Sequence, residues 1–163
     1  MKLIVFSDAH GDRRVIERIL KFNMDADYFI SLGDSELPHK YLLDLDVLSI
    51  KGNYPHDAGF VYEKMMDIEG KKVLLTHGHK QDVTHGLVTL VSYGMKHNAD
   101  IVLYGHTHVA RVDHVQEVLL INPGSISKPR SDIMPSYLIL TITKDSVEYA
   151  FKEAYTNIDI PKI

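Results

Sequence analysis

Five short apolar runs in this 163-residue chain end in the same way, because a side chain that can bind a metal ion follows within three residues. Runs of four or five apolar residues rich in β-branched side chains are typical of strands buried on both faces. In open α/β sheets, ligands bind beyond the carboxyl ends of the strands. The pattern therefore predicts strands that bring distant residues to one rim: Asp8, Asp34, Asn53, His77 and His106.

Glycine directly precedes three of these residues, at Gly33, Gly52 and Gly105. A glycine lets the backbone turn sharply or approach another group closely. The third glycine opens the sequence Gly105-His106-Thr107-His108, which follows the apolar residues 101–104. For this stretch alone, a polar turn with two solvated histidines is as good an interpretation as a metal site. The ligands at the other strand ends favour the metal site.

The first half of the chain alternates strands with helices. Strands expected over residues 3–6, 28–32 and 47–50 are separated by helices over 12–22 and 39–43. This alternation predicts a parallel sheet with right-handed crossovers. Asp12 stands where the first helix begins and is expected to cap it.

The second half is richer in strands. Residues 60–68 and 72–75 predict a hairpin, and a helix is expected over 83–97 with Leu87, Leu90, Val91 and Met95 on its apolar face. The sequence Asn122-Pro123-Gly124-Ser125 predicts a turn. Further strands are expected over residues 101–104, 110–116, 118–121, 134–143 and 146–151.

The composition excludes several classes of function. The chain has no cysteine, which rules out disulfides, thiolate zinc sites and cysteine nucleophiles. A net charge of −4 argues against specific nucleic-acid binding through a basic surface. No apolar run approaches membrane-spanning length and no signal peptide is evident, so a cytoplasmic protein without membrane contact is expected. The length fits a single domain over residues 1–163.

The candidate ligands number seven once His10 and His108 are added to the five strand-end residues. Seven ligands exceed what a single ion needs and suit two ions that share a carboxylate. Imidazole, carboxylate and amide oxygen without sulfur favour Mn²⁺, with Fe, Zn²⁺, Ni²⁺ and Mg²⁺ as alternatives. Two divalent ions would leave the site positively charged, because Asp8, Asp34 and a hydroxide neutralise only part of their charge. Such a site would attract a phosphate-containing substrate.

In this order, Asp8-x-His10, Gly33-Asp34, Gly52-Asn53, His77-Gly78-His79 and Gly105-His106-Thr107-His108 resemble the motifs of calcineurin-like metallophosphoesterases. In its small size, the chain is similar to members of the small bacterial and archaeal phosphodiesterase branch of that superfamily. The resemblance implies an α/β (α+β) fold, a four-layer αββα sandwich of two mixed β-sheets flanked by helices.

The resemblance also implies roles for the ligands. One metal would take Asp8, His10 and His108, and the other would take Asn53, His77 and His106. Asp34 would bridge the two ions. A metal-bridging water or hydroxide would attack phosphorus directly, hydrolysing a small phosphodiester. The catalytic residues implied are Asp34, Asn53, which would help to hold a phosphate oxygen, and His79.

One position departs from the family pattern. Many larger members carry a histidine after the asparagine as a general acid, whereas this chain has Tyr54. The change argues against alkyl monoesters, whose poor leaving groups need a proton. His56, which follows Pro55 in the chain, is a weaker candidate for that general acid. His79 is expected to orient substrate or a ligand, with a solvated loop histidine as the alternative, and Arg130 is more easily explained by a surface ion pair than by phosphate binding.

Two other interpretations remain open. The same fold serves as a non-catalytic protein-binding scaffold in the retromer subunit, where the metal site has decayed. A purely structural metal protein is the second alternative, although seven ligands around two ions leave coordination positions open. The sequence determines neither the physiological substrate nor the oligomeric state, and it is compatible with a homodimer.

Overall fold

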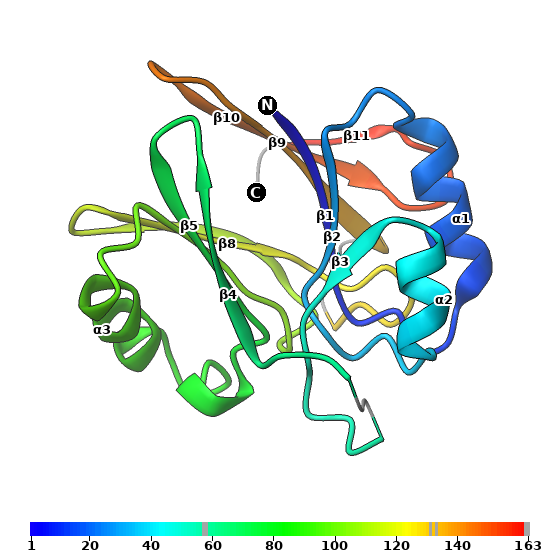
Figure 1. The fold of residues 1–163 in the computed structure, drawn as a ribbon, viewed down its shortest axis with the longest axis horizontal. Helices are drawn as coiled ribbons and strands as arrows, with labels where there is room; N and C mark the ends of the chain where they lie inside the picture. The colour runs from blue at the N-terminus through cyan, green and yellow to red at the C-terminus, as the bar shows by residue number, and fades with distance from the viewer. Residues whose placement is uncertain (57–58, 131, 133, 162–163) are drawn as a thin grey trace.

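Two mixed β-sheets face one another in the computed structural model, which describes residues 1–56, 59–130, 132 and 134–161 (Figure 1). The first sheet has the order β11 (Asp159–Ile160), β10 (Val147–Glu153), β9 (Ser136–Ile142), β1 (Lys2–Phe6), β2 (Tyr28–Ser31) and β3 (Val47–Ser49). The second has the order β4 (Glu63–Ile68), β5 (Lys71–Thr76), β6 (Ile101–Leu103), β8 (Val118–Pro123) and β7 (Ala110–Val115).

Helices cover the outer faces of both sheets (Figure 1). The helices α1 (Arg13–Phe22) and α2 (His39–Asp44) lie outside the first sheet, and α3 (Val88–Lys96) lies outside the second. The predicted four-layer αββα sandwich is therefore confirmed. In the described part of the chain, no helix is long and apolar enough to cross a membrane.

The first sheet combines parallel and antiparallel pairs. As predicted, β1, β2 and β3 are parallel, and α1 and α2 form the crossovers. The C-terminal strands then add antiparallel to the other side of β1, with Leu3 opposite Leu140. Asp12 caps α1, as expected, because its carboxylate accepts a hydrogen bond from the backbone N–H of Val15 at 3.2 Å.

The second sheet has a parallel centre of β5, β6 and β8, flanked by the antiparallel edge strands β4 and β7. The β4–β5 hairpin confirms the predicted one, although β4 begins at Glu63 and not at residue 60. Apolar side chains from the facing sides of both sheets meet in the main core, among them Leu3, Val5, Leu75 and Leu103. These central strands end at the rim that carries the candidate ligands.

The helix expected over residues 83–97 begins later than predicted. A short 3₁₀ turn, η1 (His79–Gln81), precedes it, and the α-helix starts only at Val88. Asp82 (φ 54°) and Gly86 (φ 139°) have positive φ angles, which an α-helix cannot contain. Met95 was also misplaced: it is 48% exposed, and Gly94 takes the buried position against Val102.

The turn expected at residues 122–125 is shorter than predicted. Asn122 and Pro123 complete β8, where they pair with Arg111 and Ala110 of β7. Only Gly124, with a φ of 80°, makes the sharp change of direction. A proline is tolerated at the end of a strand, where the ladder needs no further N–H donor.

Candidate metal site

The strand-end residues converge between the two sheets, as the sequence pattern predicted. The Nε2 atom of His77 lies 3.6 Å from Oδ2 of Asp34, 3.9 Å from Oδ1 of Asp8 and 3.2 Å from Oδ1 of Asn53. The His106 ring stands 5.1 Å from the His77 ring, centre to centre. Five loops, from positions 8 to 106 of the sequence, thus supply one compact group of donors.

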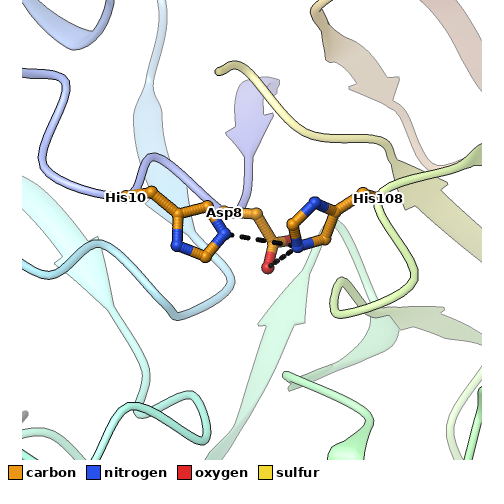
Figure 2. Close-up of side chains that lie close together, drawn as sticks. All are labelled: Asp8, His10 and His108. Atoms are coloured by element: carbon orange, nitrogen blue, oxygen red, sulfur yellow. Dashed lines mark hydrogen bonds and ion pairs between the residues drawn. The ribbon is translucent and has the colours of Figure 1, made fainter. Parts of the chain in front are cut away.

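Asp8, His10 and His108 form the first cluster of possible ligands, and Figure 2 shows their side chains turned toward one another. The Nε2 atom of His108 lies 3.2 Å from Oδ1 of Asp8 and 3.3 Å from Nε2 of His10. Two imidazole nitrogens and a carboxylate oxygen therefore face a common point. This donor set suits a divalent transition metal.

Asp8, Asp34 and His77 form the second cluster, and they are buried. Asn53 also faces this group, and His106 stands beside it. Asp8 is common to both clusters, whereas the family resemblance implied that Asp34 is the bridging carboxylate. The assignment of the bridge to Asp34 stays a prediction.

The environment of Asp8 fits a bound cation. Its side chain is fully buried, and Oδ1 has no hydrogen-bond partner among the described residues. A buried carboxylate oxygen without a partner is costly unless a cation neutralises it. The orphaned oxygen is the one that faces both His108 and His77. The residues present therefore fit a metal ion at this point.

Strained backbone conformations gather at the same place. Asp8, His10, Asp34, His106 and His108 all have positive φ angles, between 44° and 69°. Such conformations are uncommon for residues other than glycine and concentrate at functional sites, where the surrounding structure imposes them. The turn between the two histidines of residues 105–108 thus bends at the histidines themselves, and not at Gly105 as the sequence suggested.

Gly52 and Gly105 serve close packing. A Cβ atom on Gly52 would lie 2.0 Å from Oδ1 of Asp34, and one on Gly105 would lie 2.0 Å from Oγ of Ser7. Each contact joins two ligand-bearing turns from different strands. The glycines therefore let the backbone of one turn approach the ligand of the next.

Comparison with known proteins identifies the architecture. The model of the calcineurin-like phosphoesterase superfamily domain matches residues 1–145. A Bacillus subtilis protein named "Probable metallophosphoesterase YsnB" is 31% identical over 158 residues, which cover 96% of this chain and 94% of the relative. The chain belongs to the calcineurin-like phosphoesterase superfamily.

Further similarities support the same fold. "Phosphodiesterase YfcE" of Escherichia coli is 26% identical over 168 residues, covering 86% of this chain and 87% of the relative. The crystal structure of a Streptococcus pneumoniae protein described as a predicted phosphoesterase superposes with a TM-score of 0.90 at 30% identity, covering 98% and 92% of the two chains. Vps29 from Entamoeba histolytica superposes at 0.79 with 22% identity, covering 98% and 99% of the two chains, which shows the fold alone.

Membership of this superfamily implies divalent metal binding, and hydrogen bonds orient the ligands of this metallophosphoesterase. The Nδ1 atom of His77 lies 2.7 Å from the carbonyl oxygen of Leu32, and that of His108 lies 2.7 Å from the carbonyl oxygen of Lys128. A proton on Nδ1 leaves Nε2 with a free lone pair for a metal. These carbonyl partners cannot be recognised in a sequence.

Glu36 plays the same part for His10, with Oε1 2.6 Å from Nδ1 of the imidazole. Its own φ angle is 54°, which turns it back toward the site. Glu36 belongs to none of the motifs that predicted the ligands. The signal for Glu36 in the sequence was its position in an acidic loop, two residues after Asp34, the candidate bridging ligand.

The loop after β8 holds Asp8 from its backbone side. The hydroxyls of Ser125 and Ser127 donate hydrogen bonds to the carbonyl oxygen of Asp8, at 2.9 and 3.0 Å. The Asn122 amide donates to the carbonyl oxygen of Gly105 at 2.8 Å. Residues 122–127, of which 122–125 were predicted as a turn, therefore fix the two strand ends of the metallophosphoesterase site.

Charges within the site keep its carboxylates ionised. Burial by itself would raise the pKa of Asp34, but the neighbouring imidazole of His77 and a hydrogen bond from the backbone N–H of Tyr54 lower that pKa to about 2. Burial likewise opposes ionisation of Asp8, yet His108 and His77 lower its pKa. The same carboxylates raise the pKa of His77 against the effect of burial. Both aspartates are thus ready to bind cations at neutral pH.

His79 stands beside the ligand groups. Its ring lies 5.4 Å from the His77 ring and 6.1 Å from the His106 ring, and its Nδ1 atom is buried without a described partner. Burial and the nearby imidazoles lower the pKa of His79 to about 4. His79 is therefore neutral at pH 7 and lies directly beside the candidate ligands.

The other candidates lie around or away from the ligands. The Tyr54 backbone N–H contacts Asp34, and the Tyr54 ring packs against exposed His56 at 5.5 Å. Arg130 has an exposed side chain, and its backbone N–H donates to the carbonyl oxygen of His108 at 3.2 Å. The remaining histidines, which match none of the ligand motifs, lie outside both ligand clusters: His39, His85, His97 and His114.

Proposed function

We propose that the protein is a binuclear metal-dependent phosphodiesterase that hydrolyses small phosphodiesters. The observation that supports it is the pair of ligand clusters that share the buried Asp8 carboxylate, in a member of the calcineurin-like phosphoesterase superfamily. Two clusters with a common ligand suit two closely spaced ions, and such pairs are used for phosphoryl transfer. The name of the YfcE relative supports diesters as the substrate class.

In this proposal the side chains divide the work as the motifs implied. Asp8, His10 and His108 hold one ion, and Asn53, His77 and His106 hold the other, with Asp34 between them. Two divalent ions, when bound, would supply a nucleophilic water of lowered pKa and positive charge opposite the phosphoryl oxygens. Mn²⁺ is the proposed metal, because imidazole and oxygen donors occur together without sulfur.

Two residues then act on the substrate itself, and a third position restricts its leaving group. Asn53 has an exposed side chain, so its amide N–H groups can donate to a phosphate oxygen while Oδ1 faces the ligands. His79, neutral at pH 7, can donate one further hydrogen bond to the phosphate. Tyr54 stands where larger family members have the general acid, so leaving groups that need no protonation are favoured.

Hydrolysis of a chromogenic diester tests this function. The wild-type protein should hydrolyse bis(p-nitrophenyl) phosphate only when Mn²⁺ or another divalent ion is present. Asp34→Asn should lower kcat at least about 100-fold, because a buried ligand charge between the ions is lost. Asp145→Asn, in the exposed turn between β9 and β10, serves as the matched control and should retain full activity. Equal rates with and without metal would refute the proposal.

The division of the ligands has its own test. Calorimetric titration with Mn²⁺ should give two bound ions for the wild type. His106→Ala and His108→Ala should each weaken one binding event and leave the other measurable. A variant that keeps both ions at full affinity would show that the proposed division is wrong.

A non-catalytic scaffold is the second candidate, because Vps29 structures share the fold. This chain retains all seven candidate ligands, and they lie together, which favours catalysis. Absence of Mn²⁺ binding by calorimetry, together with absence of hydrolysis of any diester, would favour the scaffold.

A further inference from the structure

A pair of lysines shares one tyrosine ring beside the metal site. The Nζ atom of Lys80 lies 3.1 Å from the centre of the Tyr62 ring, and that of Lys51 lies 5.3 Å from it. Cations are attracted to the face of an aromatic ring, so Tyr62 holds two ammonium groups near one another. We call Lys51, Tyr62 and Lys80 the lysine–tyrosine group.

The backbone ties this group to the ligands. Lys51 directly precedes Gly52 and Asn53, and its N–H donates to the carbonyl oxygen of Val61 at 2.6 Å. Lys80 directly follows His79, in the 3₁₀ turn η1. The lysines therefore belong to the same two loops that carry Asn53 and His77.

Only one ring separates the group from the ligands. The Tyr62 ring lies 6.0 Å from the His79 ring, which in turn lies 5.4 Å from the His77 ring. The charge of Lys80 contributes to the lowered pKa of His79, in agreement with this closeness. A chemical group that extends past His79 from the metal site would meet the two ammonium groups.

The carboxylate next to Tyr62 in the chain makes no ion pair with either lysine. Glu63 follows Tyr62, but its carboxylate accepts a hydrogen bond from the Tyr93 hydroxyl at 2.5 Å. Among the described residues, neither lysine lies within ion-pair distance of an acidic side chain. A hollow of about 380 Å³ opens here, lined by Tyr62 and Lys80 and also by Glu63. Two ammonium groups beside one carboxylate leave net positive charge at this place, on a chain whose net charge is −4.

We infer that the lysine–tyrosine group is a substrate subsite for a second phosphate, carried by the substrate next to the phosphodiester that is hydrolysed. Ammonium groups bind phosphate by charge and hydrogen bonding. The metal ions and the lysine–tyrosine group would then each bind one phosphate of the substrate. The lysine side chains take up the face of the Tyr62 ring, which favours an anion over a stacked base. This inference rests on the proposed phosphodiesterase function and names its substrate class.

Two diesters that differ in one group test the subsite. Thymidine 5′-(p-nitrophenyl phosphate) and its 3′-phosphorylated form share the leaving group and the sugar. With Mn²⁺, the wild-type protein should hydrolyse the 3′-phosphorylated diester with a kcat/KM about tenfold higher, as one charge-assisted contact predicts. The double variant Lys51→Met/Lys80→Met should reduce the ratio of the two kcat/KM values to about one. Lys144→Met lies in the turn after β9, at the end of the sheet opposite the metal site, and should keep that ratio.

A binding measurement gives a readout apart from activity. Calorimetry with the Mn²⁺-loaded protein should show about tenfold tighter binding of thymidine 3′,5′-bisphosphate than of thymidine 5′-monophosphate, and the double variant should lose this difference. Melting temperatures confirm that the variants are folded. Hydrolysis of both diesters at equal rates by the wild type, or a preference that survives in the double variant, would overturn the subsite and leave the phosphodiesterase intact. Hydrolysis of neither diester would overturn both.

Discussion

The contact between Gly105 and Ser7 joins the turn before His106 to the turn before Asp8, and it can be tested by Gly105→Ala. The added Cβ would lie 2.0 Å from Oγ and 3.0 Å from Cβ of Ser7, far inside normal contact distances. Both residues are buried, so neither can move into solvent. The backbone of Gly105 has no positive φ, so the substitution acts through this overlap and through a tight 3.1 Å approach of the Cβ to Oδ2 of Asp8.

The magnitude follows from the packing. Forcing an extra methyl into a well-packed core costs about 1–3 kcal/mol, and the lower chain entropy of alanine in the unfolded state returns about 0.4–1 kcal/mol. The central values, about 2 and about 0.7 kcal/mol, leave a net loss of about 1.3 kcal/mol, which corresponds to a melting temperature lower by about 3–5 °C for a chain of this size. Thermal unfolding followed by circular dichroism in EDTA measures the loss without a contribution from metal.

A second substitution checks the cause. Ser7→Ala removes the oxygen at 2.0 Å, so the Gly105→Ala/Ser7→Ala double variant should recover at least half of the loss. Ser7→Ala alone should change the melting temperature little, because the hydroxyl is buried with no hydrogen-bond partner among the described residues. The reasoning fails if Gly105→Ala melts like the wild type, or if the double variant is no more stable than Gly105→Ala.

Three other outcomes are expected. Glu36→Gln removes the charged partner of the His10 imidazole and should weaken Mn²⁺ binding by about 10–100-fold, measured by calorimetry; unchanged affinity would show that the 2.6 Å contact does not orient the ligand. The pKa of Asp34 in the folded protein is about 2, below its unfolded value of 3.8, so this carboxylate stabilises the fold above pH 4 and loses that effect as the pH falls toward 2. In EDTA, urea unfolding of Asp34→Asn should therefore depend less on pH between 4 and 2 than that of the wild type. The imidazole of His79 should titrate near pH 4 in metal-free protein, because burial and the charge of His77 oppose its protonation; an NMR titration midpoint above pH 6 would contradict this environment.

The sequence predicted the residues of the site because the signal is local. Each ligand follows an apolar run, and the strand-end rule places all such residues at one rim without knowledge of the packing. Asp8, Asp34 and His77 were brought together as expected. The same local logic placed α1 and its Asp12 cap correctly.

Predictions failed where the backbone conformation departs from the one that local spacing and propensity favour. The apolar spacing from residue 83 onward is helical, yet Asp82 and Gly86 take positive φ angles and delay α3 until Val88. Asn122 and Pro123 have turn propensity, yet pairing with β7 extends the strand through them. Pairing with a neighbouring strand decided the second case, whereas in the first the exposed Asp82 and Gly86 interrupt the helix through their own backbone conformations.

The sequence by itself determined which donors the chain offers and the order in which strands present them. Only the tertiary structure decided how the donors are grouped, because grouping depends on angles and distances between loops far apart in the chain. It placed Asp8 in both clusters, turned five ligands through left-handed backbone conformations, and supplied Glu36 and backbone carbonyls to orient the imidazoles. It also placed Lys51 and Lys80 around the Tyr62 ring beside the site. No local pattern in the sequence indicates that these residues lie close together.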